Sequence, residues 1–174
     1  MTSTAPESWG PARSRTVTWH DPMIGASEGL SRPGLDYLQA MIDGELPPPP
    51  ISGLVQMGLV SVEPGRVVFT CLPDESAYNP IGAVHGGLVC TLLDSVAGCA
   101  LHSTLPQGKG YTSVEIKVSY LKAVRATSGT LTAVGTVVKA GSRVGFTEGV
   151  VTDASGAVVA TATSTLLVFD LPTA

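Results

Sequence analysis

A short stretch in the middle of the chain gathers most of the residue types that could do chemistry. It contains an amide, a histidine, a glycine pair and a carboxylate, at Asn79, His85, Gly86, Gly87 and Asp94. The two glycines stand where an apolar helix is expected to begin, so their N–H groups lack partners within the helix and can bind an anion or a developing oxyanion. Because glycine has no Cβ, a ligand can approach the backbone closely there. We therefore interpret this stretch as a candidate site.

The position of Asp94 on the expected helix suggests a role for its carboxylate. At about 100° per residue the apolar side chains that start at Leu88 cover an arc of about 220°, and Asp94 falls at about 240°. A carboxylate at the border of the buried face is partly desolvated and more basic, which suits a general base or a nucleophile. The pattern is equally compatible with Asp94 as the first residue of the solvent-exposed face.

The other polar groups of this stretch have simpler interpretations. His85 could act as a base, but a histidine at a helix start commonly caps the first turn. His85, Cys90 and Asp94 could form a thiol triad, yet Cys90 falls at about 200°, inside the apolar arc, where a free cysteine is ordinarily a small core residue. We favour capping for His85 and packing for Cys90.

The elements that would position these residues are one long helix and a set of strands. Apolar side chains at helical spacing predict a largely buried helix over 87–103. Two-residue alternation and turn sequences predict strands over 54–62, 66–72, 111–121, 129–140, 143–153 and 157–169. The order β-β-α-β-β-β-β, with the helix against an antiparallel sheet of about six strands, is an α+β arrangement.

We expect an N-terminal extension over residues 1–50 and one main domain over 51–174. The part up to about residue 30 is rich in Ser, Pro and Gly and lacks periodicity, which predicts a flexible leader. A short amphipathic helix is predicted at about 33–44. The prolines at 47–50 predict a stiff, extended spacer.

Composition narrows the class of protein. A chain of 174 residues fits one domain with one core. A charged fraction of only 14% excludes general disorder. The net charge of −4 makes nucleic acid an unexpected partner. A surface with so few charged residues predicts that a second copy of the chain covers part of it. Three cysteines without CxxC or Cys/His spacing argue against a disulfide framework and against a structural metal.

The sequence gives no sign of a membrane or secretory segment. The N-terminus carries Glu, Pro and Arg where a signal peptide has an apolar run. The longest uncharged stretch, 76–93, is interrupted by Asn, Pro, His and Gly residues, so it does not predict a membrane span. We expect a cytoplasmic, reduced protein without membrane contact.

The run from Asn79 to Asp94, with the strand 113–122, resembles the hotdog-fold acyl-CoA thioesterases of the 4HBT/PaaI-like branch, the phenylacetate-pathway type. The resemblance covers roughly residues 51–169. It rests on an Asn, an HGG motif six residues later, an Asp nine residues after the His, and a Tyr-Leu-basic strand end. It implies a hotdog fold and hydrolysis of an aryl-acyl or medium-chain acyl-CoA without a cofactor, since coenzyme A is part of the substrate.

The resemblance also implies roles for individual residues. Asn79 and the N–H of Gly86 would polarise the thioester carbonyl, and Asp94 would act as base or nucleophile. A hydroxyl at Ser113 or Thr112 would hold the water, and His85 would orient the site. The resemblance further implies a homodimer or homotetramer in which Asn79 and Gly86 of one chain meet Asp94 and Ser113 of its partner.

Coenzyme A carries several phosphates, so basic residues are needed near the mouth of the site. Arg143, in a turn, is our first choice, with Lys122 and Arg125 as helpers. Gly87 completes the expected substrate-binding set, because it lets the substrate approach the helix backbone.

Two other functions compete with hydrolysis. A hotdog dehydratase or hydratase would act on acyl thioesters, but an HGG motif followed by Asp in the helix favours hydrolysis. A non-catalytic acyl-CoA-binding module would need no carboxylate facing a thioester, so the presence of both Asn79 and Asp94 argues against it.

Overall fold

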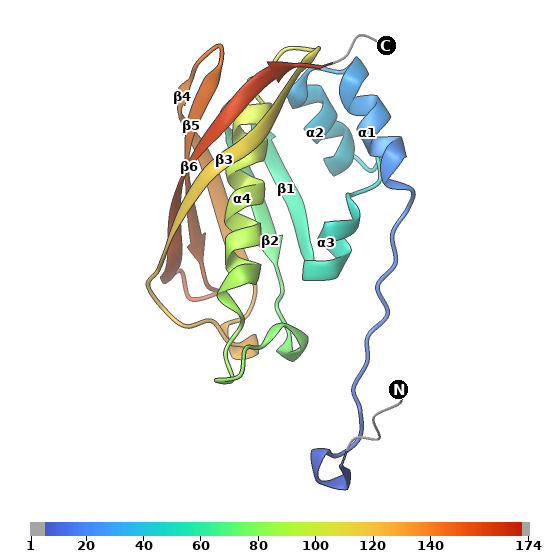
Figure 1. The fold of residues 1–174 in the computed structure, drawn as a ribbon, viewed down its shortest axis with the longest axis vertical. Coiled ribbons are helices and arrows are strands. Elements are labelled where there is room, and N and C mark those ends of the chain that lie inside the picture. The colour runs from blue at the N-terminus through green and yellow to red at the C-terminus, as the bar shows by residue number, and fades with distance from the viewer. Residues whose placement is uncertain (1–5, 172–174) are drawn as a thin grey trace.

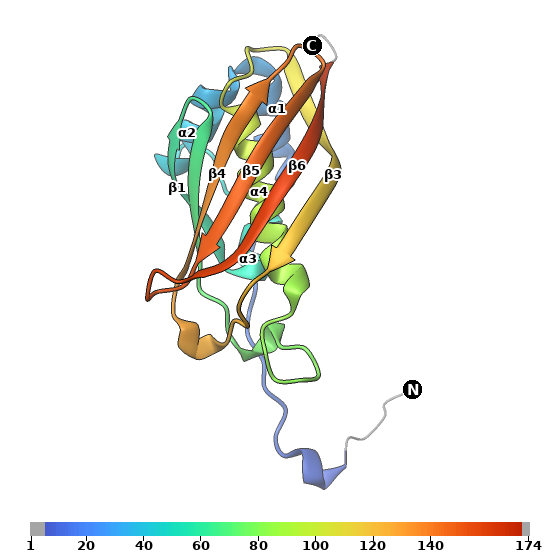
Figure 2. The same cartoon turned by 90° about the vertical axis from the view of Figure 1, so that its left-hand side faces the viewer.

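A computed structural model of the chain describes residues 6–171. One long helix, α4 (Gly86–His102), lies in the curve of an antiparallel sheet (Figure 1). The sheet contains β1 (Met57–Glu63), β2 (Arg66–Cys71), β3 (Lys109–Tyr120), β4 (Leu131–Ala140), β5 (Val144–Thr152) and β6 (Val158–Asp170). Its spatial order is β1-β2-β4-β5-β6-β3, which Figure 2 displays with α4 behind the strands. The α+β arrangement and the element order predicted from the sequence are confirmed.

Helix α4 forms because its sequence combines a strong start with a wide apolar face. His85 is the N-cap residue, and its Nδ1 accepts a hydrogen bond from Gly87 N at 2.8 Å. The apolar face packs onto the sheet, and Leu92, Leu93 and Val96 are fully buried there. This burial fixes the rotation of the helix and therefore the direction in which its polar residues point.

Two glycines allow α4 to lie close to the sheet. Gly135 of β4 pairs with Gly149 of β5 directly beneath the helix. A Cβ at Gly135 would lie 2.2 Å from the carbonyl oxygen of Val96, and one at Gly149 would lie 2.9 Å from the side chain of Leu93. The helix position thus depends on the absence of these side chains.

We expect Gly135→Ala to lower the free energy of unfolding by about 1–3 kcal/mol, because backbone atoms must move to admit the new methyl group. Chemical denaturation measures the change. Gly58→Ala is the matched control, since a Cβ at Gly58 on β1 would meet nothing within 4 Å. Equal denaturation midpoints for the two variants would show that the close approach is not needed.

The N-terminal segment is more ordered than its sequence predicts. Residues 22–31 form a helix, α1 (Pro22–Ser31), where we expected a flexible leader, so that prediction is wrong for this stretch. Its start has a recognisable local signal: the Asp21 side chain accepts a hydrogen bond from Met23 N, and Pro22 occupies the first turn. Ahead of it an extended stretch keeps contact with the body of the molecule, because Arg15 donates a hydrogen bond to the Leu54 carbonyl oxygen and Arg13 forms an ion pair with Glu75 (Figure 1). The first five residues lie outside the described part.

The predicted helix at about 33–44 is present as α2 (Gly34–Ile42). The spacer is shorter than expected, because Pro50 begins a third short helix, α3 (Pro50–Val55), and β1 starts at Met57 rather than at residue 54. Proline is tolerated in a first helical turn, where its missing N–H costs no hydrogen bond. Helices α2 and α3 both contact β1, so these two helices cover the β1 side of the domain.

Candidate active site

The carboxylate of Asp94 projects from the middle of α4 toward the edge strand β3. Ser113 Oγ donates a hydrogen bond to Asp94 Oδ1 at 2.7 Å. Asp94 is half-buried, as its place at the border of the apolar arc predicts. A carboxylate held by one hydroxyl keeps its other lone pairs free to accept a proton or to attack a carbonyl.

The structure distinguishes the two hydroxyls offered by the sequence. Ser113 contacts Asp94, whereas Thr112 precedes it on β3 and therefore points to the opposite face of the strand. The pairing of β3 with β6 is irregular between Ser113 and Glu115, so the register there depends on the bulge and not only on alternation. The Ser113 hydroxyl can still accept a hydrogen bond from a water molecule.

Asp94 and Ser113 line a cavity of about 590 Å³ that we call the acyl cavity. Its walls come from α2, α3, β1, β2, α4 and β3, with two prolines of the spacer. They are mostly apolar, and they include Leu38, Met41, Met57, Leu59 and Phe69. An apolar cavity of this size, with a carboxylate at its wall, fits a small organic group next to a reactive residue.

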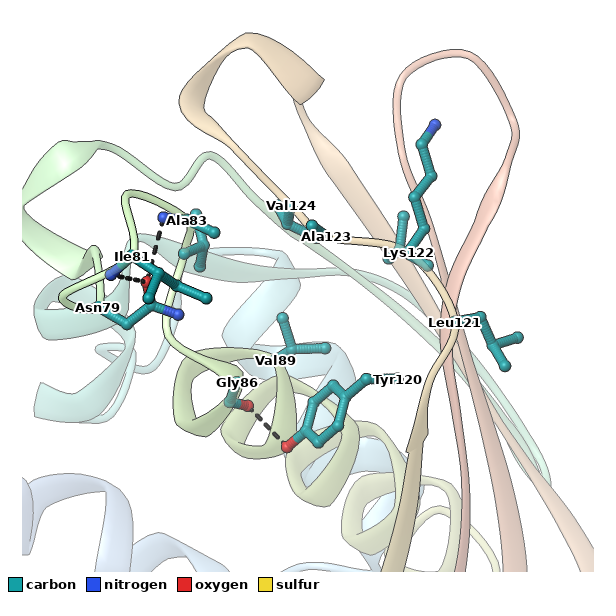
Figure 3. A pocket seen from close by; sticks show the side chains of 12 residues that line it. Asn79, Ile81, Ala83, Gly86, Val89, Tyr120, Leu121, Lys122, Ala123 and Val124 are labelled. Carbon is teal, nitrogen blue, oxygen red and sulfur yellow. Dashed lines mark hydrogen bonds between the residues drawn. The ribbon is translucent and has the colours of Figure 1, made fainter.

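A second, smaller cavity of about 320 Å³ lies at the beginning of α4, and Asn79, Gly86 and Tyr120 line it (Figure 3). Asn79 Oδ1 accepts hydrogen bonds from the N–H groups of Ile81 and Ala83, both at 3.1 Å. These bonds fix the orientation of the amide, and its nitrogen points away from the loop (Figure 3). This nitrogen and the N–H of Gly86 are two donors at one cavity.

The glycine pair at the start of α4 has structural reasons in addition to any role in binding. A Cβ at Gly87 would lie 2.9 Å from His85 Nδ1, which would disturb the cap. A Cβ at Gly86 would lie 3.1 Å from the ring of Tyr120, whose hydroxyl donates to the Gly86 carbonyl oxygen at 2.9 Å. Sequence reasoning missed this contact, although the strand-end motif contained Tyr120.

Within one chain the two halves of the predicted site do not meet. Gly86 and Asp94 are eight residues apart on α4, which separates them by about 12 Å along the helix axis. They line different cavities. The Asn79–Gly86 donors and the Asp94–Ser113 pair are therefore two half-sites on one chain.

The basic residues expected to bind phosphate lie in different places. Lys122 Nζ donates a hydrogen bond to Asp153 Oδ2 at 2.7 Å, so its charge is paired within the chain. Arg125 donates to the Gly82 carbonyl oxygen. Arg143 is exposed in the β4–β5 turn, near the end of the sheet where α4 finishes, and is far along the helix from Gly86. One chain does not bring Arg143 to the helix start.

The thiol near Asp94 is poorly suited to be a nucleophile. Burial and the neighbouring Asp94 carboxylate raise the pKa of Cys90, which disfavours its thiolate.

Residues 6–171 contain no group of three or more His, Cys, Asp or Glu side chains arranged to hold a metal ion. No helix in that part of the chain has the length and apolar character required to cross a membrane.

The sequence of the chain matches a known family model. The thioesterase superfamily model (4HBT) matches residues 81–160, which include Gly86, Asp94 and Ser113. Human acyl-coenzyme A thioesterase 13 is 37% identical over 68 residues, which is 39% of this chain and 48% of that protein. The chain thus spans about half the length of the curated relatives it matches.

Solved structures agree over a larger part of the chain. A phenylacetic acid degradation-related protein from Ralstonia eutropha has a TM-score of 0.69 and 27% identity, and the match covers 75% of this chain and 98% of that one. A Streptococcus mutans protein solved with bound acetyl CoA has a TM-score of 0.61 and 30% identity, with 67% and 91% of the two chains covered. The chain belongs to the hotdog-fold thioesterase superfamily.

Proposed function

We propose that this protein is an acyl-CoA thioesterase that hydrolyses an aryl-acyl or medium-chain acyl-CoA to the free acid and coenzyme A. The observation that carries the proposal is the Asp94–Ser113 contact at the wall of the acyl cavity. Two comparisons support the same activity: one relative is an acyl-coenzyme A thioesterase, and the Streptococcus mutans protein was solved with bound acetyl CoA.

The residues are sufficient for thioester hydrolysis. A thiol has a pKa of about 8.5, so a thiolate leaves readily and no strong general acid is required. Asn79 Nδ2 and the Gly86 N–H would stabilise the oxyanion, and the Asp94 carboxylate would either take a proton from water or attack the carbonyl itself. The one GxSxG pattern of the chain, at residues 25–29, lies inside helix α1 and not at a turn from a strand to a helix, and its Ser27 hydroxyl donates to backbone carbonyl oxygens of the same helix. It therefore forms no nucleophile elbow for a serine-hydrolase route.

The two half-sites favour an active site shared between two copies of the chain. A thioester whose carbonyl lies at Gly86 is about 12 Å from the Asp94 of the same chain, measured along α4. A second copy, related by a two-fold axis with its helix alongside, would present its own Asp94 and Ser113 to the first copy's Asn79 and Gly86. We therefore propose a homodimer, or a homotetramer built from such dimers, as the active form.

Release of free thiol from a panel of acyl-CoAs tests the proposed reaction. Thiol formed in proportion to enzyme concentration is the expected result. Hydration of an enoyl-CoA without thiol release would indicate the dehydratase or hydratase function instead. Saturable acyl-CoA binding without any turnover would indicate a binding module.

Arg143 is our candidate for a phosphate of coenzyme A, because it is an exposed arginine in a turn. Arg143→Ala should raise the KM for acyl-CoA and weaken the dependence of KM on salt. Hydrolysis of a short thioester that lacks the nucleotide should change little. Equal losses on both substrates would contradict phosphate binding by Arg143. Lys122, whose ammonium group is paired with Asp153, is expected to contribute less.

A further inference from the structure

The first turn of α4 contains one backbone donor that the turn does not use itself. A helix leaves the N–H groups of its first four residues, counted from the N-cap, without a partner in the helix ladder. Here His85 N donates to the Ala77 carbonyl oxygen at 2.7 Å. Gly87 N donates to His85 Nδ1 at 2.8 Å, and Leu88 N donates to the His85 carbonyl oxygen at 3.0 Å. The N–H of Gly86 is therefore the donor left for a ligand in the cavity that Gly86 lines.

Two neighbouring glycines make the direction of this N–H difficult to hold. Gly86 and Gly87 have no Cβ, so sterics restrict backbone rotation at either position only weakly. A donor that stabilises an oxyanion must nevertheless point in a fixed direction before the reaction begins. The surrounding residues must therefore supply the restraint that the glycines lack.

Two side chains restrain the peptide unit between these glycines. The Tyr120 hydroxyl donates a hydrogen bond to the carbonyl oxygen of this unit, which belongs to Gly86, at 2.9 Å (Figure 3). The N–H of the same unit, which belongs to Gly87, donates to His85 Nδ1. Because a peptide unit is planar, holding its C=O and its N–H fixes its orientation. We call this unit the clamped peptide.

The clamped peptide controls the Gly86 N–H because both adjoin the Cα of Gly86. The preceding peptide units are anchored through His85, whose N–H is bonded to the Ala77 carbonyl oxygen. The Tyr120 ring also packs on Gly86, since a Cβ built on this glycine would lie 3.1 Å from the ring. A rotation that turns the Gly86 N–H away from the cavity would have to break one of these contacts.

Tyr120 is itself held firmly at the end of β3. It pairs with Ala160 on β6. The next two residues along the chain donate their N–H groups to the Val159 carbonyl oxygen at 2.9 and 3.2 Å. The ammonium group of Lys122 then forms an ion pair with the buried carboxylate of Asp153 at 2.7 Å. The strand end is thus tied to the sheet and brings the phenol to one place on α4.

The Tyr120 hydroxyl is a donor that keeps its proton. Desolvation and the neighbouring Cys90 thiol raise the pKa of Tyr120, so the phenol is neutral near pH 7. Tyr120 lines the same cavity as Asn79 and Gly86, but its proton is directed at the Gly86 carbonyl oxygen. It can therefore act on the reaction through Gly86.

We propose that Tyr120 is a positioning residue: together with His85 it holds the clamped peptide, and so it directs the Gly86 N–H toward the oxyanion that develops on the thioester carbonyl. This inference rests on the proposed thioesterase function. The oxyanion carries more negative charge than the ground-state carbonyl, so a well-directed donor stabilises the transition state more than the bound substrate.

Tyr120→Phe keeps the ring and removes only the hydroxyl. We expect kcat for octanoyl-CoA to fall about two- to tenfold, the range given by the loss of one hydrogen bond, while KM changes by about twofold or less. Tyr78→Phe is the matched control, because the Tyr78 hydroxyl accepts a hydrogen bond from Ala126 N at 2.8 Å and Tyr78 lines neither cavity. Its kcat should equal that of the wild type. An unchanged kcat in Tyr120→Phe would overturn the proposal.

Infrared spectroscopy separates positioning from a general loss of structure. The probe is a ketone analogue of octanoyl-CoA, in which CH₂ replaces the thioester sulfur and the carbonyl is isotope-labelled, so it cannot be hydrolysed. Hydrogen-bond donors lower the stretching frequency of a carbonyl. We expect a higher frequency for the ketone bound to Tyr120→Phe than to the wild type, and the wild-type frequency in Tyr78→Phe. The wild-type frequency in Tyr120→Phe would overturn positioning even if kcat fell.

The other side of the clamp gives a second test. His85→Leu removes the acceptor for the Gly87 N–H and should also raise the carbonyl frequency. Added to Tyr120→Phe, it should raise the frequency by less than it does alone, because the peptide has already been released. Shifts that add fully would mean independent roles and would overturn the shared clamp. Because the ketone needs no turnover, absence of thiol release from every ester counts against the thioesterase function alone.

Discussion

Asp94→Asn should lower kcat for acyl-CoA hydrolysis by about 10²- to 10⁴-fold, the usual contribution of a general base. The amide keeps the shape of the side chain and can still accept the hydrogen bond from Ser113 Oγ. It cannot take a proton from water or form a covalent intermediate. Binding of acyl-CoA, measured by calorimetry, should therefore stay within a few-fold of the wild type.

The control for this variant is Asp36→Asn, which removes an exposed carboxylate from α2 and should retain full turnover. Ser113→Ala provides an intermediate case. It removes the hydroxyl that orients Asp94, so kcat should fall by less than in Asp94→Asn. Near wild-type turnover of Asp94→Asn would remove this carboxylate from the mechanism.

Mixing two inactive variants should restore activity if each site is shared between chains. Asn79→Asp is a sharper choice than Asn79→Ala, because it keeps the oxygen that accepts from the loop N–H groups and replaces the donor nitrogen with a negatively charged acceptor oxygen, which cannot stabilise an oxyanion. Asn79→Asp and Asp94→Asn proteins are unfolded, mixed in equal amounts and refolded. Random pairing makes about half of the dimers mixed, and each mixed dimer holds one intact site. Activity should then reach roughly a quarter of the wild type.

Wild-type protein refolded in parallel is the control for recovery. If one chain supplies all four groups, every site carries a lesion and the mixture stays at the activity of its parents. That result would reject the shared site and leave the thioesterase assignment standing. It would also require α4 or the Asn79 loop to move, because the two half-sites lie in separate cavities of one chain.

Much of this fold can be predicted from the sequence because its signals are local. The 3.6-residue repeat of α4 and the two-residue alternation of β3 are spread over neighbouring positions, and both elements occur within two residues of their predicted bounds. His85 caps α4 as its place at the helix start suggests. Helix α1 was missed although Asp21 and Pro22 carried a local start signal, because Gly25 and Gly29 weakened its pattern.

The candidate site is divided between what the sequence determines and what only the tertiary structure decides. The spacing of residues within one stretch predicts that Asn79 and Gly86 lie at the start of α4 and that Asp94 lies at the border of its apolar face. Both predictions follow from the local pattern alone. Spacing does not choose Ser113 over Thr112, because the partner of Asp94 depends on the register of an edge strand that pairs with β6.

The cluster of the Tyr37, His102 and Tyr111 rings at one end of the acyl cavity depends entirely on packing. Tyr37 and Tyr111 are separated in the sequence by α3, β1, β2 and α4, and no local pattern links either of them to His102. They meet because α2 packs against the end of α4 while β3 closes the other side. Periodicity reports the face that each element buries, whereas contacts between distant elements follow from how those faces fit together in three dimensions.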